Sequence, residues 1–117
     1  MKPNEIAEKL GLESLTPEIE QDEHVDVSSG YASDLLSDVL AHAPEGCVLV
    51  TIQVHLNVIA VSVHAGLAAV IFASGRSPEE QVRKKAVEER IPLYTSTDST
   101  FDIAGKLYAL GLRGPHE

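Results

Sequence analysis

The chain has 117 residues and a net charge of −9, from 18 acidic and nine basic side chains. Hydrophobic residues make up 44% of it and charged residues 23%, a balance typical of one globular domain. The acidity argues against nucleic-acid binding, which depends on neutralising phosphates. No apolar stretch approaches the ~20 residues of a membrane span, and the charged N-terminus MKPNEIAEKL is unlike a signal peptide. We therefore expect one cytoplasmic domain, residues 1–117 with an ordered core of about 4–112, away from membranes.

The N-terminal segment predicts a helix followed by an extended piece and a loop. Lys2–Gly11 carries apolar residues at helical spacing, with a proline in the first turn and a glycine at the stop. Leu12–Leu15 suggests a short extended segment. Thr16–Glu23 is acidic and contains a proline, which indicates a loop.

The next segment predicts a strand and a helix. Val25 and Val27 alternate with polar residues, which is typical of a strand, and Ser29-Gly30 is expected to break it. Ser33 is a suitable N-cap, and Asp34 places a negative charge in the first turn of the helix. Leucines and a valine at helical spacing then continue as far as a Pro-Glu-Gly turn.

Two apolar runs in the middle of the chain predict strands buried on both faces. Cys47–Gln53 and Leu67–Ala73 are rich in aliphatic residues and nearly free of polar ones. Asn57–Gly66 lies between them and is expected to be helical, because parallel strands need a crossover connection.

The last third repeats this alternation. Pro78–Arg90 is the clearest helix, with Ser77 and Glu80 in a capping-box pattern. Ile91–Tyr94 predicts a third short strand, and a final helix is expected over about residues 99–110. The order strand–helix–strand from residue 47 onward predicts an α/β sandwich whose mainly parallel sheet is flanked by helices.

Four polar segments follow the predicted strands. In a parallel sheet, ligands bind outside the carboxyl ends of the strands. Three of these segments precede a helix start, where unpaired N–H groups favour an anion, and Arg76 adds a cation. The alternative is that they are only caps and turns. The candidate ligand-binding residues are Ser28, Ser29, Gly30, Gln53, His55, Asn57, Ser74, Gly75, Arg76, Thr97 and Asp98.

The sequence nominates no catalytic or metal site, and we expect no cofactor. The five histidines lack the HExxH spacing, and there is no CxxC pair. Ser29, His55 and Asp98 could form a triad, but no GxSxG elbow supports one. His55 directly follows a strand, so it is a candidate site residue; the alternative is a half-buried histidine with satisfied hydrogen bonds. Cys47, the single cysteine, is either a buried hydrophobe or a reactive thiol.

Three stretches resemble the DRTGG domain family: NEIAEKLGLESL, VSSGYASDLLSDVLAHAPEGCVLVTIQVHLNVIAV and IPLYTSTDSTFDIAGKLYALGL. The most specific parts are GYASDLLSDV and TIQVHLNVIAV, and the resemblance covers about Asn4 to Leu112. The family's glycine pair corresponds to Ser29-Gly30, so a serine replaces one glycine. The arginine of the family pattern has no counterpart around Asp22–His24.

The resemblance implies a fold like the amino-terminal domain of HPr kinase/phosphorylase. It also implies an accessory role, as in phosphotransacetylases and in pyrophosphatases that carry CBS domains. Such domains self-associate, and stand-alone members are encoded near iron-only hydrogenase components in anaerobes. A protein partner in hydrogenase or central anaerobic metabolism is therefore expected. Kinase activity is not, because the chain has no GxxxxGK[ST] loop.

These observations favour a non-catalytic regulatory or scaffold domain that forms a homodimer. The apolar run Val54–Leu67 is the candidate seam, because it would suit burial on two sides. Two alternatives stay open: a sensor of a small anionic ligand, such as a nucleotide or phosphorylated metabolite, and a small enzyme. A sensor should be stabilised by its ligand at constant oligomeric state, whereas a scaffold should respond to a protein partner.

Overall fold

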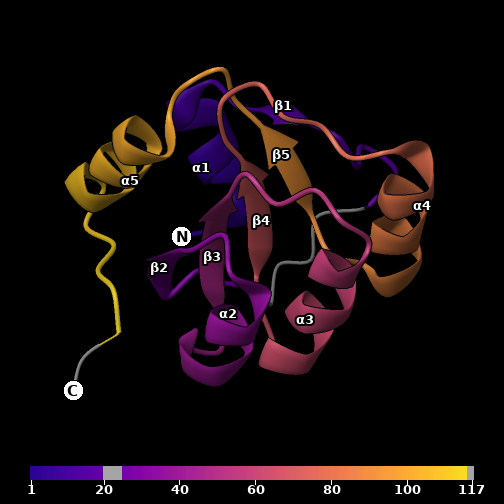
Figure 1. Cartoon of the computed structure of the whole chain (residues 1–117). Coiled ribbons are helices and arrows are strands. Elements are labelled where there is room, and N and C mark those ends of the chain that lie inside the picture. The colour runs from indigo at the N-terminus through magenta and orange to yellow at the C-terminus, as the bar shows by residue number, and fades with distance from the viewer. Residues whose placement is uncertain (20–24, 116–117) are drawn as a thin grey trace.

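The computed structural model describes residues 1–19 and 25–115. Within this part of the chain a five-stranded sheet lies between two layers of helices (Figure 1). The elements in chain order are α1 (Pro3–Leu10), β1 (Glu13–Ser14), β2 (Ser29–Ala32), α2 (Leu36–His42), β3 (Cys47–Thr51), α3 (Asn57–Ala65), β4 (Ala69–Phe72), α4 (Glu80–Glu89), β5 (Leu93–Thr95) and α5 (Thr100–Ala109). The predicted α/β sandwich with a mainly parallel sheet is confirmed.

The strand order is β1-β5-β4-β3-β2, with β2 to β5 parallel and β1 antiparallel to β5. Because successive parallel strands are neighbours, the three crossovers all step in the same direction. Right-handed connections then place their helices on one face of the sheet. Side chains of α2, α3 and α4 pack together on that face, while α1 and α5 cover the other (Figure 1).

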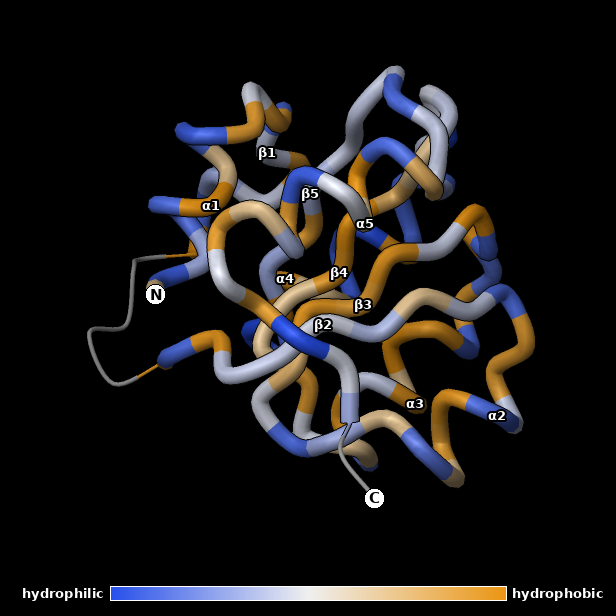
Figure 2. Tube along the Cα trace, turned by 90° about the vertical axis from the view of Figure 1, so that its left-hand side faces the viewer, coloured by the Kyte–Doolittle hydropathy of each residue, from blue (hydrophilic) through white to orange (hydrophobic). Residues whose placement is uncertain are grey.

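The central strands of the sheet coincide with the apolar runs that predicted them. Every residue of β3, β4 and β5 is buried, because helices cover both faces of the sheet. Figure 2 shows the same concentration of hydrophobic residues along β3 and β4, with hydrophilic residues toward the outside. No helix in the described ranges is long and apolar enough to cross a membrane.

Several predicted helix boundaries are confirmed. The helices α1 and α3 each end at a glycine in the left-handed conformation, with φ of 67° at Gly11 and 68° at Gly66. The helix α5 begins after Ser99, whose hydroxyl accepts a hydrogen bond from the Asp102 N–H at 3.2 Å. The predicted extended segment over Leu12–Leu15 contains β1.

The strand predicted around Val25 and Val27 is wrong. The strand of this region is β2, and it begins at Ser29-Gly30, where a break was expected. Val27 is buried in the core, but its backbone is irregular. The alternating pattern therefore reflects the burial of this side chain and not the pairing of a β-strand. His24, which completed that pattern, lies outside the described residues.

Two helices start later than predicted, and a residue expected in the first turn of each has other partners. Asp34 precedes α2, and its carboxylate accepts from the Thr51 hydroxyl at 3.0 Å and the Ile52 N–H at 2.8 Å. Glu80 does not fold back onto a Ser77 cap. It reaches forward instead to Arg83, whose Nε and Nη2 donate to it at 2.8–3.0 Å. The helix α4 therefore begins at Glu80, without a side-chain cap.

Candidate ligand site

The carboxyl ends of β2, β3, β4 and β5 lie along one edge of the sheet, and the loops that leave them form its rim. The loop after β4 leads to α4 on one face, whereas the loop after β5 leads to α5 on the opposite face. Adjacent connections that depart to opposite faces leave a crevice between them, which is where open α/β sheets bind ligands. The β4–β5 boundary is therefore the favoured position for a site.

Two pockets open at this edge and share Ser77 in their lining. The first, the Arg76 pocket, has a volume of about 650 Å³. It is lined by residues of the β3–α3 and β4–α4 loops, including Gln53, His55, Arg76, Ser77 and Gln81. The second, the Asp98 pocket, has a volume of about 410 Å³. Its lining includes Glu13, Gly75, Ser96, Thr97, Asp98 and Lys106.

The β3–α3 side of the Arg76 pocket is organised by two side chains. The Gln53 side-chain carbonyl accepts from the His55 N–H at 3.1 Å, and His55 Nδ1 accepts from the Asn57 N–H at 3.1 Å. Because His55 Nδ1 is an acceptor in this arrangement, its neutral imidazole carries the proton on Nε2. The ring therefore caps the start of α3 and keeps one N–H for another partner.

Arg76 supplies the positive charge of its pocket. Its guanidinium has no ion-pair or hydrogen-bond partner in the described part of the chain, and its side chain is exposed. The backbone beneath it is fixed, since the buried Thr95 hydroxyl donates to the Arg76 carbonyl at 2.7 Å. A free guanidinium can offer charge-assisted hydrogen bonds to a carboxylate or phosphate.

The Asp98 pocket is built from the loops after β4 and β5, which hydrogen-bond to each other. The Ser74 N–H donates to the Asp98 carbonyl and the Gly75 N–H to the Ser96 carbonyl, each at 2.8 Å. Across the pocket, Lys106 Nζ lies 2.5 Å from the Asp98 carboxylate, and this contact raises the pKa of the lysine. The pocket therefore combines hydroxyl groups with a carboxylate–ammonium pair.

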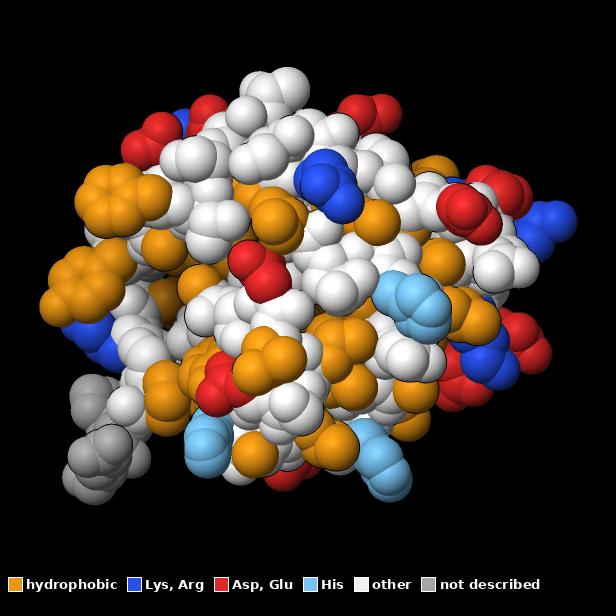
Figure 3. Space-filling view, in the orientation of Figure 1, with side chains coloured by type: hydrophobic (Ala, Val, Ile, Leu, Met, Phe, Trp, Pro, Cys, Tyr) orange, Lys and Arg blue, Asp and Glu red, His pale blue; other side chains and the backbone are white. Residues whose placement is uncertain are grey.

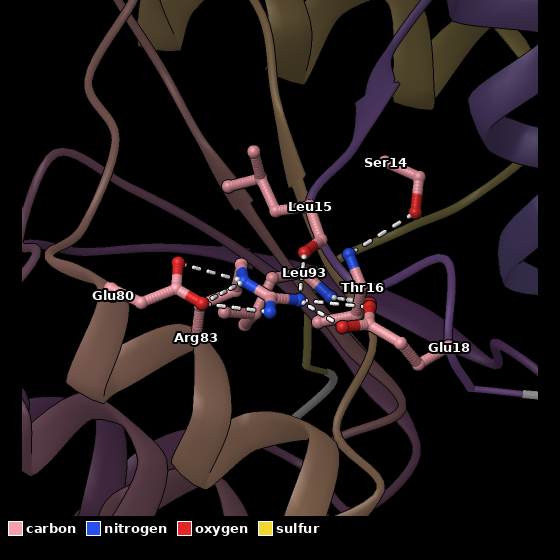
Figure 4. Close-up of polar contacts among 7 residues, drawn as sticks. All are labelled: Ser14, Leu15, Thr16, Glu18, Glu80, Arg83 and Leu93. Atoms are coloured by element: carbon pink, nitrogen blue, oxygen red, sulfur yellow. Dashed lines mark hydrogen bonds and ion pairs between the residues drawn. The ribbon is translucent and has the colours of Figure 1, made fainter.

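The segment that follows Glu13 and β1 is held by hydrogen bonds to α4 and β5 (Figure 4). Arg83 Nη1 donates to the Leu15 carbonyl at 3.3 Å and to Glu18 at 2.6–2.8 Å. These hydrogen bonds lower the pKa of Glu18 and raise that of Arg83. The Thr16 hydroxyl accepts from the Leu93 N–H at 3.1 Å. Together these contacts join the segment after β1 to β5 and α4.

The structure divides the predicted site residues into groups. Gln53, His55 and Arg76 line the Arg76 pocket, and Gly75, Thr97 and Asp98 line the Asp98 pocket. Ser74 lines neither of these two pockets; its N–H donates to the Asp98 carbonyl, and it has a positive φ of 58°. Asn57 starts α3 and also lines a groove between α3 and α4.

The expected position of Ser28, Ser29 and Gly30 is wrong. Ser29 pairs with Cys47, the first residue of β3, so this segment lies at the amino end of the sheet. The displacement follows from the strand beginning at Ser29 and not ending there. For the same reason Ser29 cannot join His55 and Asp98 in a triad.

Several polar lining residues were not among the predicted site residues, including Glu13, Ser77, Ser96 and Lys106. Glu13 reaches the site through the antiparallel β1–β5 pair, which no local pattern encodes. Lys106 lies eight residues after Asp98, on the second turn of α5, where helical spacing alone could have suggested it. Within residues 1–19 and 25–115, no group of three or more metal-ligating side chains occurs.

Comparisons with known proteins give a similarity in structure and none in sequence. No protein-family model matches the chain, and no curated protein sequence is significantly similar to it. A solved structure of the CBS and DRTGG domains from the regulatory region of Clostridium perfringens pyrophosphatase, complexed with the activator diadenosine tetraphosphate, is similar with a TM-score of 0.68 and 12% identity. The match covers 91% of this chain and 45% of that one. The resemblance to a DRTGG-like domain is thus confirmed at the level of the fold.

Proposed function

We propose that this chain is a non-catalytic regulatory domain that senses a small anionic ligand in the Arg76 pocket. The observation that carries the proposal is the guanidinium of Arg76 at the carboxyl edge of the sheet, which has no partner among the described residues although the chain has a net charge of −9. A cation kept free of the surrounding carboxylates is available to a ligand. The similar structure, a regulatory region bound to a nucleotide activator, supports a regulatory role.

The lining of the pocket offers an anion two side-chain donors. The Arg76 guanidinium presents a fork of N–H groups that matches a phosphate or carboxylate, and the His55 Nε2–H adds a neutral donor. The Glu79 carboxylate also lines the pocket and works against a second negative charge there. These features favour a singly engaged phosphate or carboxylate group over a densely charged polyanion.

The same geometry supports binding without catalysis. The His55 nitrogen that could act as a base already accepts from the Asn57 N–H. Among the contacts of the described residues, no serine, threonine or cysteine in the pocket donates to a histidine or carboxylate. Nucleophilic catalysis requires such a pair.

Isothermal titration calorimetry and thermal unfolding in the presence of inorganic phosphate, ribose 5-phosphate, acetyl phosphate and adenine nucleotides test this function. A ligand at one hundred times its Kd adds about 2.7 kcal/mol to the stability, which raises Tm by roughly 10–20 °C in a domain of this size. Arg76→Ala should abolish the response. Lys84→Ala is the matched control, because it removes one exposed cation from α4 outside the pocket. A wild-type protein indifferent to all these anions, or an Arg76→Ala variant with unchanged affinity, would refute the proposal.

A second proposal is self-association through α3, the centre of the predicted seam. Val58, Ile59 and Ser62 face the core, whereas Leu56 and Val63 are 39% and 47% exposed. The exposed residues, with Ala60, line an apolar groove of about 450 Å³ between α3 and α4. Figure 3 shows hydrophobic side chains gathered over the α2–α3 region of this face. A second copy of the chain could bury these exposed apolar residues of α3, with the same surface used by both copies, as in twofold homodimers.

Light scattering coupled to size-exclusion chromatography tests the self-association. Wild type should elute as a dimer at micromolar concentration, and Val63→Glu as a monomer. Phe101→Glu is the control, since Phe101 is an exposed apolar residue on α5, on the other face of the sheet. A monomeric wild type, or a Val63→Glu variant that stays dimeric, would contradict the α3 interface. The cytoplasmic location stays a prediction. A protein partner in hydrogenase or anaerobic metabolism also stays a prediction, and affinity capture with the Val63→Glu variant as control is its measurement.

A further inference from the structure

The two pockets at the carboxyl edge differ in chemistry although they adjoin. Arg76 lines one of them, its chain neighbour Gly75 lines the other, and Ser77 lines both. A single small molecule that contacts Arg76 can therefore extend past Ser77 into the Asp98 pocket. The side chains that line the Asp98 pocket determine which chemical group of the ligand can occupy it.

The charges of the Asp98 pocket exclude a second anion. Glu13 and Asp98 bring two carboxylates, and Lys106 supplies the only cation among the described residues that line it. That lysine is already engaged by Asp98 at 2.5 Å. The remaining negative charge of Glu13, which has no ion-pair partner within residues 1–19 and 25–115, would repel a phosphate.

The polar groups of this pocket instead match hydroxyl groups. Carboxylate oxygens accept hydrogen bonds from hydroxyls, as the acidic residue of a dinucleotide-binding fold does from a ribose. Asp98 uses one oxygen for Lys106, which leaves its other oxygen and both oxygens of Glu13 as acceptors. Ser77 and Thr97 add hydroxyls that can donate or accept. The lining is polar and neutral-to-acidic, so it suits a polyol and not an apolar ring.

We infer that the ligand is a phosphorylated polyol, a sugar phosphate or the ribose phosphate of a nucleotide, with its phosphate at Arg76 and its hydroxyl groups in the Asp98 pocket. This inference rests on the anion site proposed above and adds the identity of the second half of the ligand. It distinguishes such compounds from inorganic phosphate and acyl phosphates, which carry the anion without the hydroxyls.

Calorimetry with inorganic phosphate and ribose 5-phosphate as paired probes tests the inference. Wild type should bind ribose 5-phosphate at least ten-fold more tightly than phosphate. Glu13→Gln and Asp98→Asn should reduce this ratio several-fold, because each removes a carboxylate acceptor from the Asp98 pocket. Arg76→Ala should weaken both probes together. Glu13→Gln keeps the test independent of the Asp98–Lys106 contact, and circular dichroism confirms that each variant is folded.

The outcomes separate the two proposals. Equal affinity for the two probes, lost in Arg76→Ala, would keep the anion site and overturn the polyol subsite. A preference for ribose 5-phosphate that survives both Glu13→Gln and Asp98→Asn would also overturn the subsite, because the hydroxyls would then bind elsewhere. Absence of binding by both probes would overturn the subsite together with the anion site.

Discussion

Replacing Thr16 by valine should destabilise the domain strongly for a change that conserves shape. Thr16 is 4% exposed, and its hydroxyl accepts from the Leu93 N–H at 3.1 Å, while the Leu15 N–H donates to the Leu93 carbonyl at 2.9 Å. These two contacts complete the outer edge of β5 beyond the two-residue strand β1 (Figure 4). Valine fills the same volume but leaves the Leu93 N–H buried without an acceptor.

An unpaired buried donor costs about 1–3 kcal/mol. A loss of about 2 kcal/mol lowers Tm by roughly 8–16 °C in a domain of this size. Thr16→Ser is the matched control, because it keeps the hydroxyl and removes only one methyl group, worth about 0.8 kcal/mol. Urea unfolding followed by circular dichroism, with hydrogen exchange at the Leu93 amide, measures both variants. If Thr16→Val were as stable as Thr16→Ser, or kept the Leu93 amide protected, the side-chain hydrogen bond would not be what completes this edge.

Three further changes have defined outcomes. Hydrogen bonds from Arg83 hold the pKa of Glu18 below its ordinary 4.5, so their contribution is present above that pH and is lost as the pH falls through the lowered pKa. Urea unfolding should therefore show Arg83→Met less stable than wild type at pH 7, with a smaller difference near pH 3. Burial raises the pKa of Cys47 to about 11, so a thiol reagent at pH 8 should modify it only in denaturant; modification of the native protein would contradict this. Gly66→Ala should lower Tm more than Gly11→Ala. Both glycines have a left-handed φ, which costs alanine about 1–2 kcal/mol, but only at Gly66 would the new Cβ meet a glutamate side chain, at 2.9 Å.

The parts of the fold that the sequence predicts well are those in which burial and local preference agree. β3 and β4 are buried on both faces, so their apolar runs were sufficient to identify them. β2 was misplaced because it is an edge strand with the sequence Ser-Gly-Tyr-Ala, only partly buried and without an apolar run. Its strand character comes from pairing with β3 and not from its own composition.

The site was predictable to the extent that it follows strand ends. Gln53, His55, Arg76 and Asp98 were found because each lies within four residues of the end of a β-strand that the apolar pattern had located. Glu13 was not, since it arrives through an antiparallel pair formed by distant segments. The division of these residues into two pockets also depends on which face each helix occupies, and this is a property of the strand order.

The strand order also separates the Ser29-Gly30 segment from the candidate site. Because β2 to β5 follow one another without a reversal, the crevice of the sheet opens only where α4 and α5 leave on opposite faces, at the carboxyl ends of β4 and β5. Ser29 lies at the amino end of the edge strand, where its hydroxyl is buried and without a hydrogen-bond partner among the described residues. A hydroxyl in that position contributes nothing to a ligand at Arg76 and loses its hydration on folding. Ser29→Ala is thus expected to leave the calorimetric affinity for anions unchanged and the stability undiminished. A loss of affinity in this variant would mean that the ligand binds at the opposite edge of the sheet.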